Sequence, residues 1–306
     1  MTDAGRQGAA GPTDVFDAIA DETRMRILVV LAEARREEWP DGLQYSDLQD
    51  RAGVADSGRF NYHLQQLRPE SVVKSDGEYH LSLTGLRVYQ LLVAGHVQGE
   101  TTDSNERTVD VEAACPRCGE RLEATYSDWF TLVVSCPGSS MRTVPTELLP
   151  RCYDSHGAAA PRAADLLRRQ RMSLFAAGVC PFCAGAASVG VVRPGSPRME
   201  VIDGDLEVAY GFDCLECGWF DAATVGGVAY TKPAVVGFFA EHGRSIYDYR
   251  TWELAWACTD EHTTVGENEA GEWRADVAVR LDGEELVVTS DGDATVRETR
   301  REQVGD

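Results

Sequence analysis

The sequence predicts an α+β fold in two parts, a mainly helical N-terminal part and a β-rich, cysteine-bearing remainder. All nine cysteines lie at or after Cys115, and apolar residues recur at helical spacing before about residue 97. After about residue 110, short apolar or alternating runs are separated by turns that contain glycine, which is typical of β-strands. A chain of 306 residues is long enough for two or more domains, each with its own core.

The charge balance is strongly acidic and poor in lysine. Asp and Glu number 50 against 29 Lys and Arg, and the only lysines are Lys74 and Lys232. Such surfaces stay hydrated in molar salt, so the composition is typical of extremely halophilic archaea; the alternative is a solvating or ligand-specific acidic surface. No apolar run is long enough to cross a membrane and the N-terminus lacks a signal segment, so we expect a soluble, cytoplasmic protein with no membrane partner.

The N-terminal part begins with a series of predicted helices. Pro12-Thr13-Asp14 starts the first helix, and Asp21-Glu22-Thr23 caps the second. A short helix follows at Tyr45–Arg51 and is ended by Gly53. After a brief turn the next helix opens at Asp56-Ser57, where either side chain can accept a hydrogen bond from the first free amides.

This last helix, from Ser57 to Arg68, has one apolar and one polar face. At about 100° per residue, Phe60, Leu64 and Leu67 share the apolar face. The outward face is polar, aromatic and cationic, and the helix contains no acidic residue although the chain has a net charge of -21. Because such side chains hydrogen-bond to base edges and phosphates, the pattern predicts a DNA recognition helix.

A hairpin and a closing helix complete the pattern. Val72–Lys74 and Tyr79–Leu83 are predicted strands on either side of a turn with Asp76-Gly77 at its tip. Thr84-Gly85 opens a last amphipathic helix. Two helices joined by a tight turn and followed by a hairpin predict a winged helix-turn-helix domain over residues 12–97, with the hairpin as its wing.

The same region resembles the ArsR-type winged helix-turn-helix regulators, over about Thr13 to Val97. The similarity lies in three segments, Ala18–Leu28, Phe60–Leu64 and Leu83–Gly85. The resemblance implies binding to operator double-stranded DNA as a homodimer that pairs through its first and last helices. Metal-sensing members carry a cysteine pair on the helix before the recognition helix. That helix has no cysteine here, so we expect no arsenic or cadmium sensing at this site.

We expect the outward side chains of the recognition helix and one wing residue to contact DNA. Lys74 would meet a phosphate, and the helix would enter the major groove. Molar salt removes most of the gain from phosphate contacts, which favours contacts to base edges. The alternative is a winged helix used for protein contacts. The predicted DNA-binding residues are Ser57, Arg59, Asn61, Tyr62, Gln65, Gln66 and Lys74.

The second part contains two Cys-x-x-Cys pairs, Cys180/Cys183 and Cys214/Cys217. Two thiolates on a tight turn can meet one ion at tetrahedral angles, and predicted strands between the pairs bring the two turns together. We therefore expect a structural Zn²⁺ site with four cysteine ligands, with a redox pair as the alternative. A site closed by four thiolates stabilises the fold and leaves no position for catalysis.

A second, incomplete set of cysteines lies upstream. Cys115 and Cys118 form one pair, but Cys136 is followed by Ser139 where a further cysteine would complete a zinc ribbon. Cys152 or His156 are candidates for the fourth ligand, and a degenerate ribbon without metal is the alternative. A predicted hairpin, Leu122–Tyr126 with Phe130–Val134, lies between the two turns.

The rest of the C-terminal part is predicted from its periodicity. A helix at 161–177 has Leu166, Leu167 and Leu174 on its apolar side and four arginines elsewhere, which either pair with carboxylates or touch the DNA backbone. Cys258 is expected to be a buried thiol. A helix is predicted at Val235–His242, and strands at Trp252–Ala257, Ala275–Leu281, Glu285–Thr289 and Ala294–Arg297. The aromatic residues Phe238, Phe239, Tyr247, Tyr249, Trp252 and Trp256 form core or line a small-ligand pocket.

These observations predict a dimeric, sequence-specific transcriptional regulator with a C-terminal zinc-stabilised domain for sensing an unidentified effector, dimerisation or partner binding. The alternative is a general transcription-machinery or nucleic-acid-binding factor that uses its zinc ribbons for contacts. No Ser/His/Asp constellation, phosphate loop or open metal site supports an enzyme. The expected organisation is a DNA-binding domain at 12–97, a linker at 98–110, a degenerate ribbon at 111–160, a connecting helix at 161–177, and a zinc ribbon with a small β-rich region at 178–300.

Overall fold

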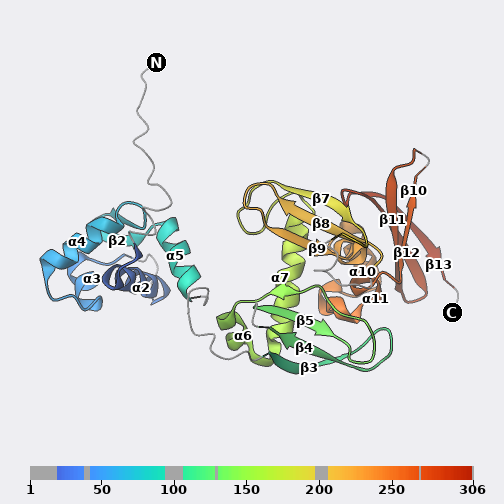
Figure 1. Ribbon diagram of the computed structural model, residues 1–306, viewed down its shortest axis with the longest axis horizontal. Helices are drawn as coiled ribbons and strands as arrows, with labels where there is room; N and C mark the ends of the chain where they lie inside the picture. Colours follow the sequence, from blue (N-terminus) through green and yellow to red (C-terminus); the bar gives the residue numbers. More distant parts are fainter. Residues whose placement is uncertain are drawn as a thin grey trace, which may run out of the picture. The chain divides into compact units, whose positions relative to one another are not determined.

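The computed structural model describes residues 19–37, 42–93, 106–127, 130–196, 206–268 and 270–304. The chain is a mixture of helices and strands, as expected, and divides into two compact units, Met1–Glu100 and Thr101–Asp306 (Figure 1). The helix predicted at Pro12 and most of the predicted linker, 98–110, lie outside the described residues. No described helix combines the length and the apolar character that crossing a bilayer requires.

The first unit consists of helices followed by a hairpin and one more helix, in the predicted order. A core that includes Ile27, Leu28, Leu48, Phe60 and Leu64 joins them. The elements are α2 (Glu22–Glu37), α3 (Tyr45–Arg51), α4 (Ser57–Leu67), β1 (Val72–Ser75), β2 (Glu78–Leu81) and α5 (Leu83–Val93).

Local side-chain chemistry fixes the ends of these elements. The Asp21 carboxylate accepts the Arg24 amide at 3.0 Å, and Asp56 accepts the Arg59 amide at 2.6 Å, so both predicted caps are present. Gly53 follows α3 with a φ of 66°, a conformation that glycine adopts without strain. At the hairpin turn, Asp76 and Gly77 both have positive φ, which suits the twist of a two-residue turn.

The second unit contains three antiparallel sheets and several helices. The sheets have the orders β3-β4-β5-β6, β7-β8-β9 and β10-β11-β12-β13. The strands are β3 (Arg107–Ala114), β4 (Arg121–Tyr126), β5 (Thr131–Ser135), β6 (Thr146–Glu147), β7 (Ala187–Val192), β8 (Ala209–Cys214), β9 (Phe220–Ala223), β10 (Thr263–Glu267), β11 (Trp273–Leu281), β12 (Glu284–Asp291) and β13 (Val296–Gln303). The helices are α6 (Pro150–His156), η1 (Gly157–Ala159), α7 (Ala160–Phe175), α9 (Val225–Ala229), α10 (Pro233–Glu241), η2 (Ile246–Asp248), η3 (Thr251–Glu253) and α11 (Ala255–Cys258).

Helix α7 joins two hydrophobic cores of this unit. Its N-terminal residues Ala160 and Ala164 pack in the core of the β3–β6 sheet, together with Trp252. Its C-terminal residues Met172 and Phe175 pack in a larger core built from β8, α10, β11 and β12. Figure 1 shows α7 running between the β3–β6 sheet and the β7–β9 sheet.

The structure corrects several sequence-based expectations in this unit. Strand β3 begins at Arg107, inside the predicted linker, because it pairs in register with β4 from Arg107–Tyr126 onward. The segment predicted as a strand at Trp252–Ala257 is instead η3 and α11. Its helical turns are held by hydrogen bonds from the Thr251 amide to Asp165 and from the Cys258 amide to Leu254. Strand β10 was not anticipated, and β13 extends to Gln303, beyond the expected domain end at 300.

The buried face of α7 also differs from the prediction. Leu166 and Leu174, placed on the apolar side by their spacing, are exposed by 45% and 37%. The buried face carries Asp165 and Arg169 instead. These two residues are one helical turn apart and neutralise each other, so a charged pair replaces the expected leucines in the interior.

Candidate metal centres and nucleic-acid interface

The outward face of α4 presents the residues predicted to contact DNA. Phe60, Leu64 and Leu67 are fully buried beneath the helix, as predicted. The Arg59 side chain makes no hydrogen bond or ion pair with any other described residue, and Tyr62 is 60% exposed. All of the α4 residues in the predicted set are exposed, namely Ser57, Arg59, Asn61, Tyr62, Gln65 and Gln66.

Several residues of the predicted set have partners within the protein. On α4 itself, Gln65 Nε2 donates to Asn61 Oδ1 at 3.5 Å, and the Tyr62 ring lies 5.3 Å from the His63 ring. The Ser57 hydroxyl lies 3.2 Å from the Gln49 side-chain oxygen, and this hydrogen bond ties α4 to α3. Lys74 is exposed on β1, with its Nζ 4.9 Å from the centre of the Tyr79 ring. His63 is buried at the edge of the apolar face, and its Nδ1 lies 3.3 Å from Asp21 of the segment before α2. The outward face itself carries no carboxylate.

The four predicted zinc ligands of the second unit come together. Cys180, Cys183, Cys214 and Cys217 place their Sγ atoms within 4.8 Å of one another. Cys214 ends β8, and β7 lies beside it in register from Ala187–Cys214, so the sheet brings the two turns to the same end. Four thiolates at this separation suit one tetrahedrally coordinated metal ion.

Hydrogen bonds within the second turn favour the thiolate form that a metal requires. The Cys217 amide donates to Cys214 Sγ at 3.3 Å, and the Glu216 amide donates at 3.4 Å. Donation from the Cys217 amide, against the opposing effect of burial and together with the Glu216 amide, lowers the pKa of Cys214 to about 6. A thiolate is therefore accessible at neutral pH.

The upstream cysteines also form a cluster. Cys115, Cys118 and Cys136 place their Sγ atoms within 4.8 Å of one another, and Cys118 and Cys136 are 3.4 Å apart. The two candidates for a fourth ligand, Cys152 and His156, lie on α6 and do not join this cluster. The nearest further donor is the Ser139 hydroxyl, 3.4 Å from Cys115 Sγ.

The Cys115 thiol is activated in a similar way. Burial opposes its ionisation, but hydrogen bonds from the Ser139 hydroxyl and from the Cys118 and Arg117 amides outweigh that effect and lower the pKa of Cys115 to about 7. The positions of the sulfur atoms allow both clusters to hold a metal ion. The upstream group, Cys115, Cys118 and Cys136, is called the first cluster and offers three sulfur ligands. The four-cysteine group is called the second cluster.

Comparison with family models identifies the part of the chain that holds both clusters. The model described as Domain of unknown function (DUF7351) matches residues 112–296. The chain belongs to the DUF7351 family. A second model, described as Domain of unknown function (DUF7347), matches residues 12–92, which include α2 to α4, the hairpin and most of α5. No curated protein and no solved structure matches the chain.

The arginines of the helix α7 in the DUF7351 region pair mainly with carboxylates of the same unit. Arg168 lies 3.2 Å from Asp221, Arg169 lies 2.5 Å from Asp165, and Arg171 lies 3.8 Å from Glu147. Of the two roles left open by the sequence, the structure therefore shows carboxylate pairing for these three. The four-residue spacing of Asp165 and Arg169 is the sequence signal that could have revealed their pair.

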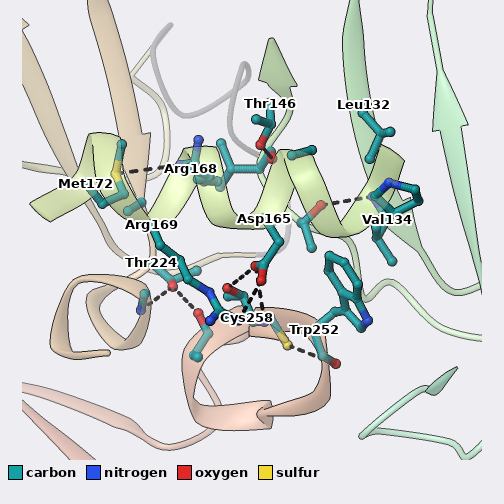
Figure 2. Close-up of a pocket in the computed structure, with 18 residues that line it drawn as sticks. Leu132, Val134, Thr146, Asp165, Arg168, Arg169, Met172, Thr224, Trp252 and Cys258 are labelled. Atoms are coloured by element: carbon teal, nitrogen blue, oxygen red, sulfur yellow. Dashed lines mark hydrogen bonds and ion pairs between the residues drawn. The ribbon is translucent and has the colours of Figure 1, made fainter. Parts of the chain in front are cut away.

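A small cavity of about 50 Å³ lies beside this pair in the DUF7351 region (Figure 2). Leu132, Val134 and Trp252 contribute to its walls, and Asp165 and Arg169 project into the same space from α7. Within the described chain, Arg169 Nε, Arg169 Nη1 and Trp252 Nε1 are buried donors without a hydrogen-bond partner. Since an aromatic ring needs a cavity of about 150 Å³, this one suits a few water molecules that satisfy those donors.

The aromatic cluster predicted as core or pocket belongs mainly to the core. Phe238, Phe239 and Trp256 are buried in the large core of the DUF7351 region, and of the six predicted residues only Trp252 lines the cavity just described. Cys258 also lines it and is buried, as predicted, and burial raises the pKa of this thiol to about 12. A thiol of that kind is inert at neutral pH.

Proposed function

We propose that this protein is a cytoplasmic, sequence-specific DNA-binding transcriptional regulator with an N-terminal winged helix-turn-helix of the ArsR-like type. In this proposal α3 and α4 form the helix-turn-helix, β1 and β2 the wing, and α4 the recognition helix. The C-terminal DUF7351 region is stabilised by zinc and serves sensing, dimerisation or partner binding.

The outward face of α4 carries the proposal. It exposes an arginine, an asparagine and two glutamines in an 11-residue helix without a carboxylate, while the chain as a whole has a net charge of -21. In the major groove an Arg side chain forms two hydrogen bonds with the edge of guanine, and a Gln side chain forms two with the edge of adenine. Arg59 is not engaged by another described residue, so its guanidinium is available to such an edge.

The zinc part of the proposal is supported by the donor set. Four thiolates within 4.8 Å of one another match the ligand type and number of structural zinc sites. Each thiolate pair lies on a turn at the end of a strand, so binding one ion would lock β7 and β8 at the same end. Metal binding then contributes directly to the stability of this unit.

The DNA-binding test compares two double variants of the full chain at one fixed salt concentration. A duplex enriched from a random-sequence library by the wild type is titrated with wild type, with Arg59→Ala/Gln65→Ala, and with the control Arg280→Ala/Gln303→Ala. The control removes the same residue types from exposed positions on β11 and β13. A side chain that forms two hydrogen bonds to one base contributes about 1–3 kcal/mol, so the α4 variant should bind at least about tenfold more weakly.

Equal affinity of the α4 variant and the control variant for the enriched duplex would refute the assignment of α4 as the recognition helix. Failure to enrich any duplex, with DNA binding retained, would instead favour the general nucleic-acid-binding factor.

A further inference from the structure

The two cysteine clusters are built from four turns that share one backbone hydrogen bond. In each turn the amide of the first residue donates to the carbonyl five residues later. These hydrogen bonds are Cys115 to Glu120 at 2.7 Å, Cys136 to Met141 at 2.9 Å, Cys180 to Gly185 at 2.9 Å and Cys214 to Trp219 at 2.8 Å. The turn that begins at Cys136 shares this hydrogen bond but carries one cysteine only. Its Ser140 does not have the positive φ of Gly119, Ala184 and Gly218, which stand at the same place in the other three turns.

The difference between the clusters lies in a single side chain. Cys217 follows Cys214 by three residues and supplies the fourth thiol of the second cluster. Ser139 follows Cys136 by the same interval, and its Oγ lies 3.4 Å from Cys115 Sγ, at the place of the missing fourth donor. A neutral hydroxyl is not among the usual protein ligands of zinc, which are cysteine, histidine and carboxylate. The first cluster therefore offers three strong donors and one open position.

A groove borders this cluster on the side of Cys136 and Ser139. A groove of about 480 Å³ runs along β5, and Cys136 and Ser139 form part of its wall together with Ser135 and Ser140. Cys115 and Cys136 are buried on the core side, as Cys180 and Cys214 are in the second cluster. Cys115 and Cys136 thus face the core, Cys118 is exposed, and Ser139 lies on a groove large enough for water or a small ligand.

We propose that Cys115, Cys118 and Cys136 bind an exchangeable zinc ion whose fourth ligand is a water molecule supplied from this groove. The ion in the second cluster, closed by four thiolates, is permanent. The inference rests on the zinc binding of the proposed function and is independent of its DNA binding. An incoming ligand can attack zinc directly at an open position, whereas a closed site must first lose a protein ligand. The occupancy of the first cluster would then follow the concentration of free zinc, which makes it a zinc-responsive site.

The test measures zinc release from the zinc-loaded full chain to an excess of a chromogenic chelator, 4-(2-pyridylazo)resorcinol. The wild type should contain two zinc ions per chain and release them in two phases. Losing a residue that only hydrogen-bonds to a metal ligand lowers metal affinity by roughly 10–100-fold. A missing direct ligand should have at least that effect, so we expect the fast phase to be at least about tenfold faster than the slow one. Ser139→Cys closes the first cluster and should move its ion into the slow phase. Ser139→Ala leaves the three thiolates in place and should keep the fast phase.

Two further variants assign the phases to the clusters. Cys118→Ser should remove the fast phase and leave the slow one. Cys183→Ser is the matched change in the second cluster; it opens that cluster and should remove the slow phase. A total of one zinc ion per chain in the wild type would overturn the proposal. So would two ions released in one phase that Ser139→Cys does not alter, or loss of the fast phase in Ser139→Ala, which would make the hydroxyl the ligand. Loss of DNA binding alone, with two release phases intact, would refute the proposed function and leave this inference standing.

Discussion

At the scale of single residues, the Asp165–Arg169 pair is an ion pair buried between α7 and η3. The side chains are 3% and 9% exposed, and Asp165 also accepts the amide and the hydroxyl of Thr251. Arg169 lies against the Tyr230 ring, 4.3 Å from its centre. Burying two charges costs desolvation energy that their attraction and these hydrogen bonds must offset, so removing one partner leaves the other uncompensated.

We expect Asp165→Ala to lower the free energy of unfolding by about 3–5 kcal/mol, because it leaves a buried guanidinium without its carboxylate. The double variant Asp165→Leu/Arg169→Met removes both charges and should lose less than the single variant. The measurement is urea unfolding at fixed salt. The control Asp154→Ala breaks an exposed pair with Arg107 and should change stability by no more than about 1 kcal/mol. A double variant less stable than Asp165→Ala would contradict this account.

At the scale of elements, the last helix of the first unit leaves apolar side chains in solvent. Leu83 and Leu91 on α5 are 72% and 52% exposed, while Gly85 is buried against the Ser71 carbonyl and positions the start of the helix. Pairing with a second copy of the chain through this helix is the arrangement that the ArsR resemblance implies. Leu91 is therefore a candidate contact for the homodimer that the resemblance implies.

We expect Leu91→Glu to convert the dimer to a monomer, because a charge on this face must be desolvated when two copies pair. Light scattering coupled to gel filtration measures the mass of the full chain. The control Leu215→Glu places the same change at another exposed leucine, which is 67% accessible and lies in the turn of Cys214 and Cys217. A wild type that runs as a monomer, or a Leu91→Glu variant that stays dimeric, would rule out pairing through α5.

Elements with a strong local signal were predictable from the sequence. The caps at Asp21 and Asp56, the Asp76-Gly77 turn and the Cys-x-x-Cys turns each need one residue type at one position, so the pattern identifies them. The absence of a fourth cysteine at Ser139 was also predictable, because the Cys-x-x-Cys spacing identifies the position where it would stand. What failed depended on tertiary partners: Trp252–Ala257 alternates like a strand but becomes helical against Asp165.

The face of α7 shows the same limit. A helical wheel counts leucines as core and charges as surface, and it cannot register that Asp165 and Arg169 neutralise each other once both are buried. The buried face carries Ala164, Met172 and Phe175 beside the pair, and Leu166 is exposed. For the metal clusters, the sequence supplied the ligand residues, whereas the exclusion of Cys152 and the solvent access at Ser139 required the structure.

At the scale of the whole molecule, the two units depend on different sources of stability. All nine cysteines lie in the unit Thr101–Asp306, and the unit Met1–Glu100 has a core of its own built from α2 to α5 and the hairpin. In the second unit four of the cluster cysteines belong to the hydrophobic cores: Cys115 and Cys136 pack with β4 and β5, and Cys180 and Cys214 pack in the larger core. Loss of metal should therefore unfold one unit and spare the other.

We expect prolonged treatment of the full chain with a strong chelator to make the second unit sensitive to limited proteolysis, while a fragment ending near residue 100 survives. The physical reason is that a structural zinc site contributes about 10–16 kcal/mol of binding free energy in small zinc-dependent peptides, as much as the whole stability of a typical domain. The readout is the mass of the protected fragment, and zinc added back should restore protection of the second unit. Cys183→Ser opens the four-thiolate site, so it should give the same fragment after a shorter treatment with the chelator. Brief chelation that removes only the fast-exchanging ion should leave the second unit protected, since the four-thiolate site stays closed.

Complete removal of zinc with both units still protected would mean that the clusters do not hold this fold together.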